Sequence, residues 1–554
     1  MKEQVISSLK KITNLSECDL DRILEIPKDK NLGDFAFPCF FLAKTMKKNP
    51  VQIAQELSNT IDKKNFEKVE AKGAYLNFFL KKANLAKEVL TKVLKEKSKF
   101  GSSNLGNGKK IVIDLSAPNI AKPFGIGHLR STIIGNSIAE TAKFIGFKVI
   151  KINYLGDWGT QFGKLILGYK KWGNEKELKK NPILHLQELY VRVNKSEEFE
   201  EESREEFKKL EEGDKENLKL WKKFRELSLV EFNRIYDILN VKFDITSGES
   251  EYNHKMDTVI KMLKEKRLLK ESDGAQVVDL DKYNLGVCLL KKSDGATLYA
   301  TRDITAAIDR YNRFKFDQMI YEVGAEQKLH FKQFFKVLEL SGHSWAKECV
   351  HVSHGLYLDS DGKKFSTRKG KTVYMSDILD ETINLAKKEI EKREKISKTE
   401  IDKRAKAIAL SAIVYGDLKN YRENDAIFDI DRFISFEGNT GPYILYAYAR
   451  ANSILAKKKA PIKFEIPELD EATKQLVLRL NEFPESVLKA YNLLAPNIIA
   501  NYVHSLSQQF NEWYHSSQVI GSVQESFRLN VVKSTVQVIE NALKLLGIPL
   551  IKRM

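Results

Sequence analysis

Two segments of the chain combine glycines with side chains that can bind phosphate groups. In the first, IVIDLSAPNIAKPFGIGHLRSTIIGN, a strand ends at Leu115, and a helix begins near His128 after a turn that contains Gly125 and Gly127. Glycines let a ligand approach the backbone, a helix start offers free N–H groups, and His128 adds a directional donor. This segment alone is weak support for a site, because a histidine at a helix start is often only a cap.

The second segment, GLYLDSDGKKFSTRKGKTV, covers residues 355–373 and gathers cations and hydroxyls between glycines. That composition suits the binding of a triphosphate. The residues concerned are Lys363, Lys364, Ser366, Thr367, Arg368, Lys369 and Lys371. No convincing Ser/His/Asp or Cys/His arrangement indicates a protein nucleophile, so the expected chemistry is positioning and charge stabilisation.

The elements around these segments predict an α/β fold with a doubly wound, Rossmann-type parallel sheet. From Lys110 onward, short β-branched runs alternate with helical segments, and ligands of such sheets bind where strands end. Four further runs are expected to complete the sheet: 276–279, 286–290, 316–323 and 349–352. Residues 196–226, a dense mixture of Glu and Lys, predict an exposed helical insertion.

The chain is expected to form three domains. Residues 1–105 read as a small α+β domain with a strand at 73–80, followed by a turn-rich linker at 101–110. Residues 106–375 form the sheet domain, with a helical insertion at about 173–245. Residues 376–554 show helical spacing, as at 401–418, 441–455, 497–514 and 527–546, and predict an all-helical bundle.

The charge of the chain suits a polyanionic partner. Lys plus Arg exceed Asp plus Glu by 92 − 75 = +17, which favours nucleic acid, although a lysine-rich composition can also serve solubility alone. No apolar run approaches the about 18 residues of a membrane span, and the N-terminus lacks a signal peptide, so we expect a cytoplasmic protein without a membrane partner. The four cysteines are far apart and are expected to be buried apolar residues: Cys18, Cys39, Cys288 and Cys349.

The two phosphate-binding segments together resemble the HIGH and KMSKS signatures of class I aminoacyl-tRNA synthetases. They stand here as GIGH, Gly125–His128, and KFSTR, Lys364–Arg368. Three more stretches narrow the resemblance to arginyl-tRNA synthetase, over essentially the whole chain: SAPNIAKPF, NYLGDWGTQFG at 153–163, and FEGNTGPYILYAYAR at 436–450. Two positions depart from the signatures. Gly125 replaces the first histidine and removes a donor to ATP, whereas Thr367 replaces the second lysine, whose charge Lys122 is expected to supply.

The resemblance implies a reaction and its participants. An arginine–tRNA ligase activates L-arginine with ATP and Mg²⁺ to arginyl-adenylate, then transfers the arginyl group to the 3′-terminal ribose of tRNA(Arg), giving AMP and pyrophosphate. The family is usually monomeric and usually needs bound tRNA for activation. The implied catalytic residues are Lys122, His128, Lys364 and Arg368, with no protein metal ligand. The implied ATP-binding residues are Pro118, Gly125, Gly127, His128, His354, Gly355, Lys364, Phe365 and Ser366.

The substrate is expected to be arginine, because several residues could bind a guanidinium group. The planar fork of donors in a guanidinium needs facing carboxylates, and a lysine ammonium could not satisfy the same acceptors. The resemblance places Glu249 and Asp303 against the fork and Tyr299 on the same wall, with Ser116, Asn119 and Gln327 at the rest of the substrate. Without the resemblance, Asp303 would be read as the cap of a helix beginning near Ile304 and Glu249 as a surface carboxylate.

Residues for tRNA are expected in both flanking domains. Tyr75 and Asn77 match the aromatic and amide positions of a domain that grips the tRNA elbow and D-loop, although a packed strand would explain them nearly as well. In the helical bundle, aromatics could stack on anticodon bases or pack inward: Tyr443, Tyr446, Tyr448, Trp513 and Tyr514. Tyr448 and Trp513 are the chosen candidates.

Three other functions compete with this interpretation. A tRNA-binding paralogue with a decayed site would explain Gly125, but it would not explain why the other signature residues remain. An adenylyltransferase of the same superfamily would have no use for the long helical C-terminus. Specificity for glutamate or cysteine would not need two acidic residues in the pocket.

Overall fold

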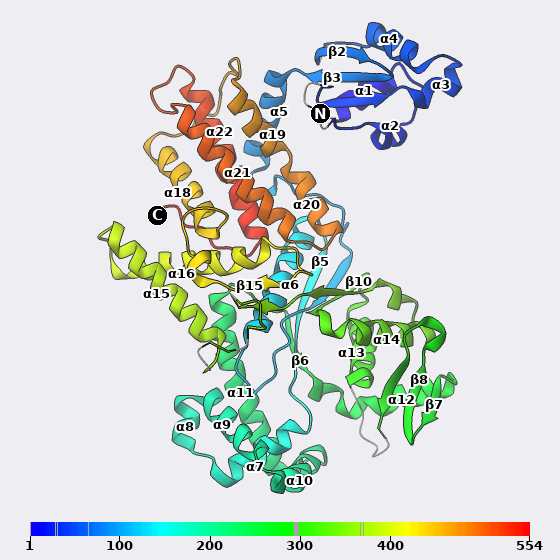
Figure 1. The fold of residues 1–554 in the computed structure, drawn as a ribbon, viewed down its shortest axis with the longest axis vertical. Coiled ribbons are helices and arrows are strands. Elements are labelled where there is room, and N and C mark those ends of the chain that lie inside the picture. Colours follow the sequence, from blue (N-terminus) through cyan, green and yellow to red (C-terminus); the bar gives the residue numbers. More distant parts are fainter. Residues whose placement is uncertain are drawn as a thin grey trace. The chain divides into compact units, whose positions relative to one another are not determined.

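The structure is a computed structural model that describes residues 2–27, 29, 32–64, 66–292, 299–359, 361–365, 367–368 and 371–554. For residues 82–84, 367, 368, 371, 372 and 393 it describes the backbone only. The chain divides into two compact units, whose elements are labelled in Figure 1. The smaller unit contains residues 1–100, 454–482 and 508–538, and the larger contains 101–453, 483–507 and 539–554.

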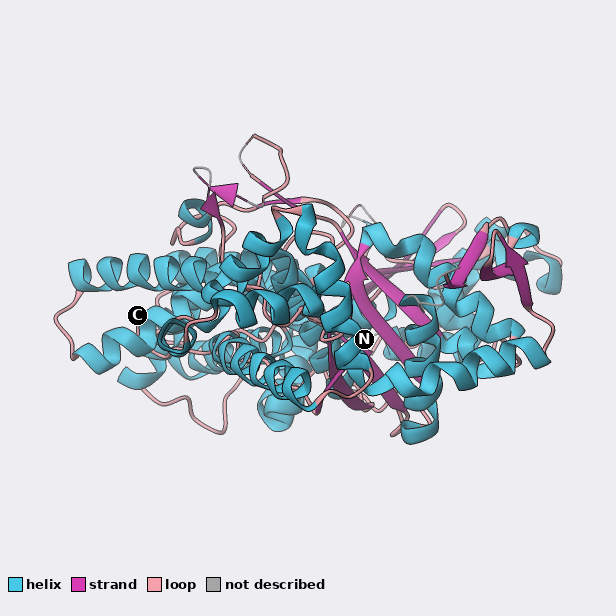
Figure 2. Ribbon diagram, turned by 90° about the horizontal axis from the view of Figure 1, so that it is seen from below, coloured by secondary structure: helices cyan, strands magenta, loops and turns pink. Residues whose placement is uncertain are grey.

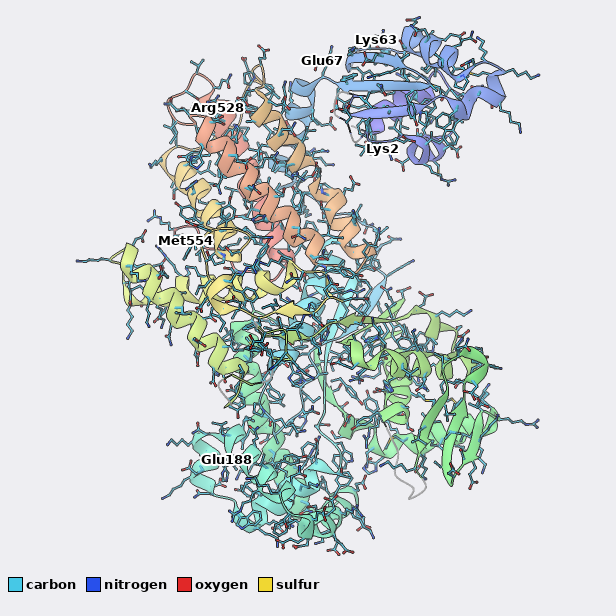
Figure 3. The ribbon with its side chains drawn as sticks, in the orientation of Figure 1. Lys2, Lys63, Glu67, Glu188, Arg528 and Met554 are labelled. Carbon is cyan, nitrogen blue, oxygen red and sulfur yellow. The ribbon has the colours of Figure 1, made fainter. Side chains whose placement is uncertain are left out.

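The N-terminal part of the smaller unit is built on a three-stranded antiparallel sheet of order β1-β3-β2. Its strands are β1 (Phe35–Pro38), β2 (Phe66–Lys72) and β3 (Tyr75–Leu80), and its helices are α1 (Lys2–Lys10), α2 (Glu17–Ile23), α3 (Phe40–Met46) and α4 (Pro50–Thr60). Leu76 and Phe78 of the central strand are fully buried. The predicted strand at 73–80 is therefore confirmed. Lys2 of α1 pairs with Asp21 of α2 at 2.9 Å and is labelled in Figure 3.

The remaining helices of the smaller unit come from distant parts of the sequence. Helix α5 (Lys82–Glu96) contacts α19 (Glu471–Asn481). Trp513 is 1% exposed, and its Nε1 donates to Thr473 Oγ1 at 2.9 Å. Cys18 is exposed, contrary to the prediction that all four cysteines are buried, because α2 turns only Leu20 into the core.

The larger unit contains a five-stranded parallel sheet of order β11-β10-β4-β5-β6. The strands are β4 (Lys110–Asp114), β5 (Lys148–Leu155), β6 (Ile245–Gly248), β10 (Gln318–Gly324) and β11 (Cys349–His354). Val112 and Ile152 pack in one core with residues of α12 (Met256–Glu265), α13 (Tyr299–Phe314) and α14 (Lys328–Leu340). Helix α6 (Ile126–Phe144) also contacts the sheet. The predicted α/β class is correct, and strands appear in magenta among cyan helices in Figure 2.

Two of the expected strands do not join that sheet. Residues near 276–279 and 286–290 form β8 (Ala275–Asp279) and β9 (Val287–Lys291), which pair with β7 (Leu269–Ser272) in a separate antiparallel sheet. Their assignment to the parallel sheet was wrong, because short connections let these neighbouring strands pair as hairpins. The predicted strands at 316–323 and 349–352 are confirmed as β10 and β11.

Helices make up the rest of the larger unit and of the C-terminal region. Between β5 and β6 stand α7 (Gln161–Trp172), α8 (Glu175–Lys180), α9 (Pro182–Asn194), α10 (Glu200–Glu211) and α11 (Lys215–Ile238). The short strands β12 (Tyr357–Leu358), β13 (Thr367–Arg368) and β14 (Lys371–Thr372) precede α15 (Met375–Arg393) and α16 (Lys398–Leu418). The strand β15 (Ala426–Ile427) follows α16. After it come α17 (Ile430–Phe433), α18 (Gly441–Lys457), α20 (Phe483–Asn492), α21 (Asn497–Ser516) and α22 (Glu525–Leu545). Within the described residues, no helix has the length and apolarity needed to cross a membrane.

Candidate active site

The residues predicted to bind substrates follow the carboxyl ends of the parallel strands. Parallel strands end at the same edge of a sheet, so residues far apart in sequence come together there. His354 ends β11, and Gln327 follows β10 in the 3-10 helix Ala325–Gln327. Ser116 follows β4, Asp157 follows β5, and Glu249 follows β6. This edge of the sheet therefore carries the site.

The turn after β4 is held in an unusual backbone conformation. Ser116, Ala117 and Ala121 have positive φ angles of 74°, 47° and 59°. Such conformations are strained for residues with a side chain and persist only when surrounding contacts hold them. The Ser116 N–H donates to Ser131 Oγ at 2.9 Å, and the Ala121 N–H donates to Ser228 Oγ at 2.8 Å. Helices α6 and α11 thus fix the path of this turn.

His128 sits in the first turn of α6 with one ring nitrogen already engaged. Its Nδ1 accepts the Gly125 N–H at 3.1 Å. An accepting Nδ1 carries no proton, so the neutral ring has its hydrogen on Nε2. Burial lowers the pKa of His128 to about 4, and the neighbouring His354 lowers it further. His128 is therefore a neutral Nε2–H donor at neutral pH.

The second predicted segment begins and ends beside the first. The Phe365 N–H donates to Tyr357 O at 2.8 Å, and the Phe365 ring lies 5.4 Å from that of Phe428. Beyond the loop, the Met375 N–H donates to Phe124 O at 3.0 Å, directly ahead of Gly125. Lys364 is exposed. Ser366 lies outside the described residues, and only the backbone of Arg368 is described.

Arg130 joins the two segments and was missed by sequence reasoning. It is 1% exposed, and its Nε lies 3.1 Å from Asp417 Oδ1 of α16. Its Nη1 donates to Asn424 O at 3.0 Å and to Leu356 O at 3.3 Å, next to Gly355. A buried ion pair with additional hydrogen bonds is costly to break. Its position two residues after His128 is the only signal that the sequence offered.

Gly355 is required by a close approach of two backbones. A Cβ at this position would lie 2.7 Å from the backbone carbonyl carbon of Asn424. The neighbouring His354 is 8% exposed, and its Nδ1 lies 2.8 Å from Glu322 Oε1. Burial disfavours the imidazolium, but the Glu322 carboxylate outweighs burial and raises the pKa of His354. His354 at the end of β11 is thus balanced by the Glu322 carboxylate.

Glu249 and Asp303 lie near each other at the other half of the edge. Their side chains are 16% and 25% exposed. Burial raises the pKa of Glu249 to about 7, Arg302 opposes this, and the Asp303 charge raises it further. Asp303 Oδ2 lies 2.6 Å from His330 Nε2. Helix α13 begins at Tyr299, so Asp303 is not its cap, and Glu249 is not a surface carboxylate.

Two buried polar atoms of β5, which pairs with the strand before Glu249, have no hydrogen-bond partner in the described part of the chain. Within the described residues, Tyr154 Oη and Asn153 Oδ1 have no hydrogen-bond partner, while Asn153 Nδ2 donates to Tyr236 Oη at 3.0 Å. Burial raises the pKa of Tyr154, and the Asp303 and Glu249 charges raise it further. An unpaired buried polar group costs about 1–3 kcal/mol, which a polar ligand can offset. Both residues lie in the NYLGDWG stretch, which carries the family resemblance but was not predicted to belong to the site.

Asp157 of the same stretch positions the Glu249 turn. It is fully buried and accepts hydrogen bonds from the Ser250 N–H at 2.9 Å and from Arg225 Nε at 3.0 Å. On the neighbouring turn, Asn119 forms a parallel backbone bridge with Gly156. A Cβ at position 156 would lie 2.1 Å from Asn119 Oδ1. The conformation of the NYLGDWG turn therefore sets the positions of two predicted substrate residues.

The other predicted site residues differ in exposure. Ser116 is buried, and its Oγ accepts from Thr132 Oγ1 at 2.8 Å and lies 2.8 Å from Tyr236 Oη. Gln327 is exposed, and Tyr299 is 67% exposed. Lys122 Nζ lies 5.5 Å from the ring centroid of Tyr190. Pro118 is buried, whereas Gly127 is exposed.

Three of the four predicted tRNA contacts, Asn77, Tyr448 and Trp513, are buried. Tyr448 is 0% exposed and donates from Oη to Glu540 Oε1 at 2.6 Å, and Trp513 is similarly enclosed. A side chain without exposed area cannot stack on a base, so these two candidates were wrong and the packing alternative holds for them. Tyr75 is half-buried beside Phe40, with ring centroids 5.8 Å apart, and Asn77 is 2% exposed.

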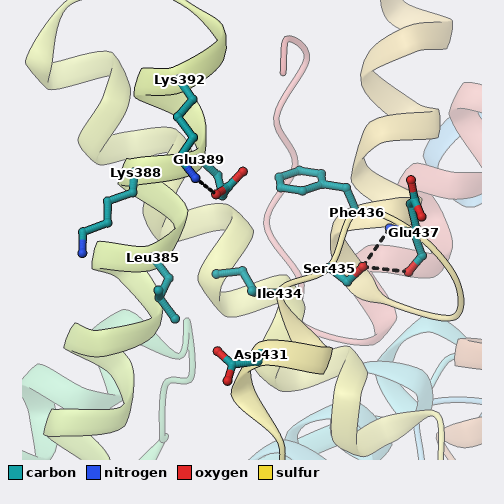
Figure 4. A pocket seen from close by; sticks show the side chains of 9 residues that line it. All are labelled: Leu385, Lys388, Glu389, Lys392, Asp431, Ile434, Ser435, Phe436 and Glu437. Atoms are coloured by element: carbon teal, nitrogen blue, oxygen red, sulfur yellow. Dashed lines mark hydrogen bonds and ion pairs between the residues drawn. The ribbon is translucent and has the colours of Figure 1, made fainter.

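A hollow of about 460 Å³ lies between α15 and the segment after α17 (Figure 4). Leu385, Lys388 and Lys392 face it from the helix, and Asp431 and Phe436 face it from the other side. None of the predicted site residues lines it. The candidate active site is thus defined by the strand ends and not by this hollow.

Comparison with known proteins assigns families to three consecutive parts of the chain. Residues 1–80 match the family described as arginyl tRNA synthetase N terminal domain. Residues 89–430 match tRNA synthetases class I (R), catalytic domain, and residues 444–554 match the DALR anticodon binding domain.

Full-length relatives share nearly half of their residues with the chain. An arginine–tRNA ligase of Clostridium perfringens is 45% identical over 566 residues and covers 100% of both chains. One from Ligilactobacillus salivarius is 46% identical and covers 96% of both. The solved structure of Thermus thermophilus arginyl-tRNA synthetase has a TM-score of 0.81 at 24% identity over 96% of both chains.

Proposed function

The chain belongs to the arginyl-tRNA synthetase family, and we propose that Glu249 and Asp303 recognise arginine beside a nucleotide site built on His128, His354 and the Lys364 loop. As an arginine–tRNA ligase, it activates arginine with ATP and charges tRNA. The observation that carries the residue assignment is the pair of partly buried acids at the strand edge that also bears His128 and His354.

The guanidinium is bound between the two acids. Two ionised carboxylates match its planar donors, and bound positive charge favours the ionised form of Glu249, whose pKa burial raises to about 7 and the Asp303 charge raises further. Asn119, Gln327 and Tyr299 are assigned to the rest of the substrate. Ser116 positions the turn, because its Oγ is already engaged by Tyr236 and Thr132.

The nucleotide is bound over the start of α6. The neutral Nε2–H of His128 donates to phosphate oxygen, and His354 lies beside it. Gly125, Gly127, Gly355, Pro118 and Phe365 form the surface for the remainder of ATP. Lys122, Lys364 and Arg368 supply positive charge, with Ser366 in the same loop. These groups stabilise negative charge that spreads over the phosphates during reaction.

Activation needs no protein nucleophile. A carboxylate oxygen of arginine attacks the α-phosphorus, and the bond to the pyrophosphate leaving group breaks. In the second step, a terminal ribose hydroxyl of the tRNA attacks the activated carbonyl, its proton is released, and AMP leaves. The protein therefore contributes alignment and charge, which together can lower a barrier by many kcal/mol.

Mg²⁺ is proposed to enter with ATP. In the part of the chain that the structure describes, no three His, Cys, Asp or Glu side chains form a metal site. Mg²⁺ commonly binds through phosphate oxygens and retained waters, and it would neutralise phosphate charge. The protein is further proposed to act as a monomer in the cytoplasm.

The three parts of the chain are proposed to have different roles with the tRNA. Residues 1–105 contact the elbow and D-loop with Tyr75, residues 106–375 catalyse, and residues 376–554 bind the anticodon. The family matches at 1–80, 89–430 and 444–554 support this division. The net charge of +17 suits a partner with many phosphates.

The decisive test is exchange of pyrophosphate into ATP with each amino acid separately, with and without tRNA. We expect exchange with arginine only, and a strong dependence on tRNA. Absence of exchange at saturating substrates, with tRNA binding retained, would instead indicate a binding protein that has lost its chemistry.

A further inference from the structure

A basic hollow of about 500 Å³ lies in the larger unit, near the amino end of β6. Its walls come from α6, β5, the segment before β6 and the end of the chain after α22. None of the residues assigned to arginine or ATP lines it. Its volume falls within the range of small-molecule sites. The hollow is therefore a candidate for a second ligand.

One lysine of the hollow is buried. The side chain of Lys151 is 7% exposed, and its Nζ donates to Asn136 Oδ1 at 3.0 Å. Glu140 Oε1 lies 3.5 Å from Lys151 Nζ but only 3.1 Å from Lys143 Nζ, so one carboxylate faces two ammonium groups. Burial lowers the pKa of Lys151. A buried ammonium is unfavourable unless negative charge compensates it.

Two more lysines line the hollow from other elements. Lys242 precedes β6, Lys544 lies near the end of α22, and both are exposed. Among the described residues, neither forms an ion pair. Four lysines against Glu140 give the lining a formal charge of 4 − 1 = +3. Asp244 does not line the hollow, and its Oδ2 accepts the backbone N–H of Lys151 at 2.8 Å.

We propose that this hollow binds a diphosphate group, either as free pyrophosphate or as part of a nucleotide. Converging ammonium groups suit the several oxygens of a diphosphate, and its charge of about −3 matches the lining. No arginine fork is present among the lining residues to select a planar carboxylate. The Asn136 and Asn240 amides supply further polar contacts. The site is independent of the catalytic assignment.

The test is isothermal titration of the full-length protein with pyrophosphate, at matched ionic strength. The variant Lys242→Gln/Lys544→Gln removes two exposed charges, and Lys261→Gln/Lys264→Gln on α12 removes two exposed charges elsewhere in the same unit. We expect the first variant to lose one binding event, or at least 10-fold in affinity, and the second to bind as the unchanged protein does. Both variants should charge tRNA normally.

Equal pyrophosphate binding by the two variants would overturn the proposal. So would a loss of tRNA affinity with unchanged pyrophosphate binding, because the hollow would then contact tRNA phosphates. A parallel titration with ADP separates the two sources: loss of ADP binding in the first variant identifies a nucleotide site, and loss of pyrophosphate binding alone identifies a site for the free anion. A Lys151→Met variant provides a second check. Pyrophosphate should raise the melting temperature of this variant less than it raises that of the unchanged protein.

Discussion

The two halves of the proposed active site differ in charge. The arginine half contains the acids Glu249 and Asp303, and the nucleotide half contains His128, His354 and the Lys364 loop. At the arginine half, Glu249 and Asp303 are two partly buried acids, and the pKa of Glu249 is raised to about 7. At the nucleotide half, His128 is neutral, His354 is balanced by Glu322, and Lys364 is exposed. The arginine half thus places two carboxylates beside Arg302 and His330, and a bound cation would add to the charge that balances them.

This difference indicates where selectivity and rate arise. A partly buried acid pair would penalise any substrate that fails to neutralise both carboxylates, so we propose that the arginine half controls the choice of amino acid. The nucleotide half offers directional donors to phosphates that every ATP-dependent reaction shares, so it controls the rate. Substitutions in the two halves should separate these effects.

The largest effect is expected from removing an acid at the arginine half. Asp303→Asn or Glu249→Gln should lower kcat/KM for arginine about 10²- to 10³-fold while leaving the KM for ATP within about 2-fold. Steady-state exchange kinetics measure this. The matched control is Glu251→Gln, an exposed acid two residues from Glu249. Equal losses for arginine and ATP would contradict the separation of the two halves.

A smaller loss is expected from the nucleotide half. His128→Ala removes the Nε2–H donor and should lower kcat about 100-fold, with the KM for arginine nearly unchanged. Single-turnover adenylate formation is the measurement, and His515→Ala, at an exposed histidine, is the control. If arginine affinity fell as much as the rate, His128 would have to act on both halves.

The pH dependence should distinguish the halves as well. Glu249 must be ionised to bind the guanidinium, and its raised pKa of about 7 means that its ionised fraction increases about 10-fold from pH 6 to pH 8. The KM for arginine should therefore fall about 10-fold over this range and then level off. In Glu249→Gln this trend should vanish, whereas the pKa of His128, about 4, leaves its neutral form dominant throughout.

The smallest effect is expected at Gly125. A Cβ placed there has His128 Nδ1 as its nearest neighbour, at 3.8 Å, so Gly125→His is sterically possible. Since His128 already offers an Nε2–H donor at this turn, the variant should show at most a few-fold gain in kcat. A rate increase of 100-fold would mean that the nucleotide half is limited by the missing donor.

Local sequence features predicted much of the fold but not the pairing of its strands. The alternation of strands and helices after Lys110 predicted the parallel sheet, and helical spacing predicted α16, α18, α21 and α22. The strands β8 and β9 were found but assigned to the wrong sheet. Pairing depends on contacts between distant segments, which local periodicity does not contain.

In the candidate site, too, local sequence patterns predicted some features, whereas features that depend on distant contacts were not predicted. Gly125–His128 and the Lys364 segment were visible as motifs because glycines, a helix start and cations recur at short spacing. Tyr448 and Trp513 were misjudged, since an aromatic at helical spacing reads alike whether it packs inward or faces solvent. Arg130, Asn153 and Tyr154 were missed because their roles appear only through burial and partners far along the chain.

By itself, the sequence determined the class of fold, the two segments proposed to bind phosphate groups and, through its resemblance, the family. Only the tertiary structure decided that Glu249 and Asp303 lie near each other, that His128 carries its proton on Nε2, and which aromatics are enclosed. The physical reason is that protonation and burial depend on the neighbours that folding provides. Gly125, three residues away, fixes Nδ1 of His128, whereas the groups around Glu249 and Tyr448 come from segments tens of residues apart in the chain.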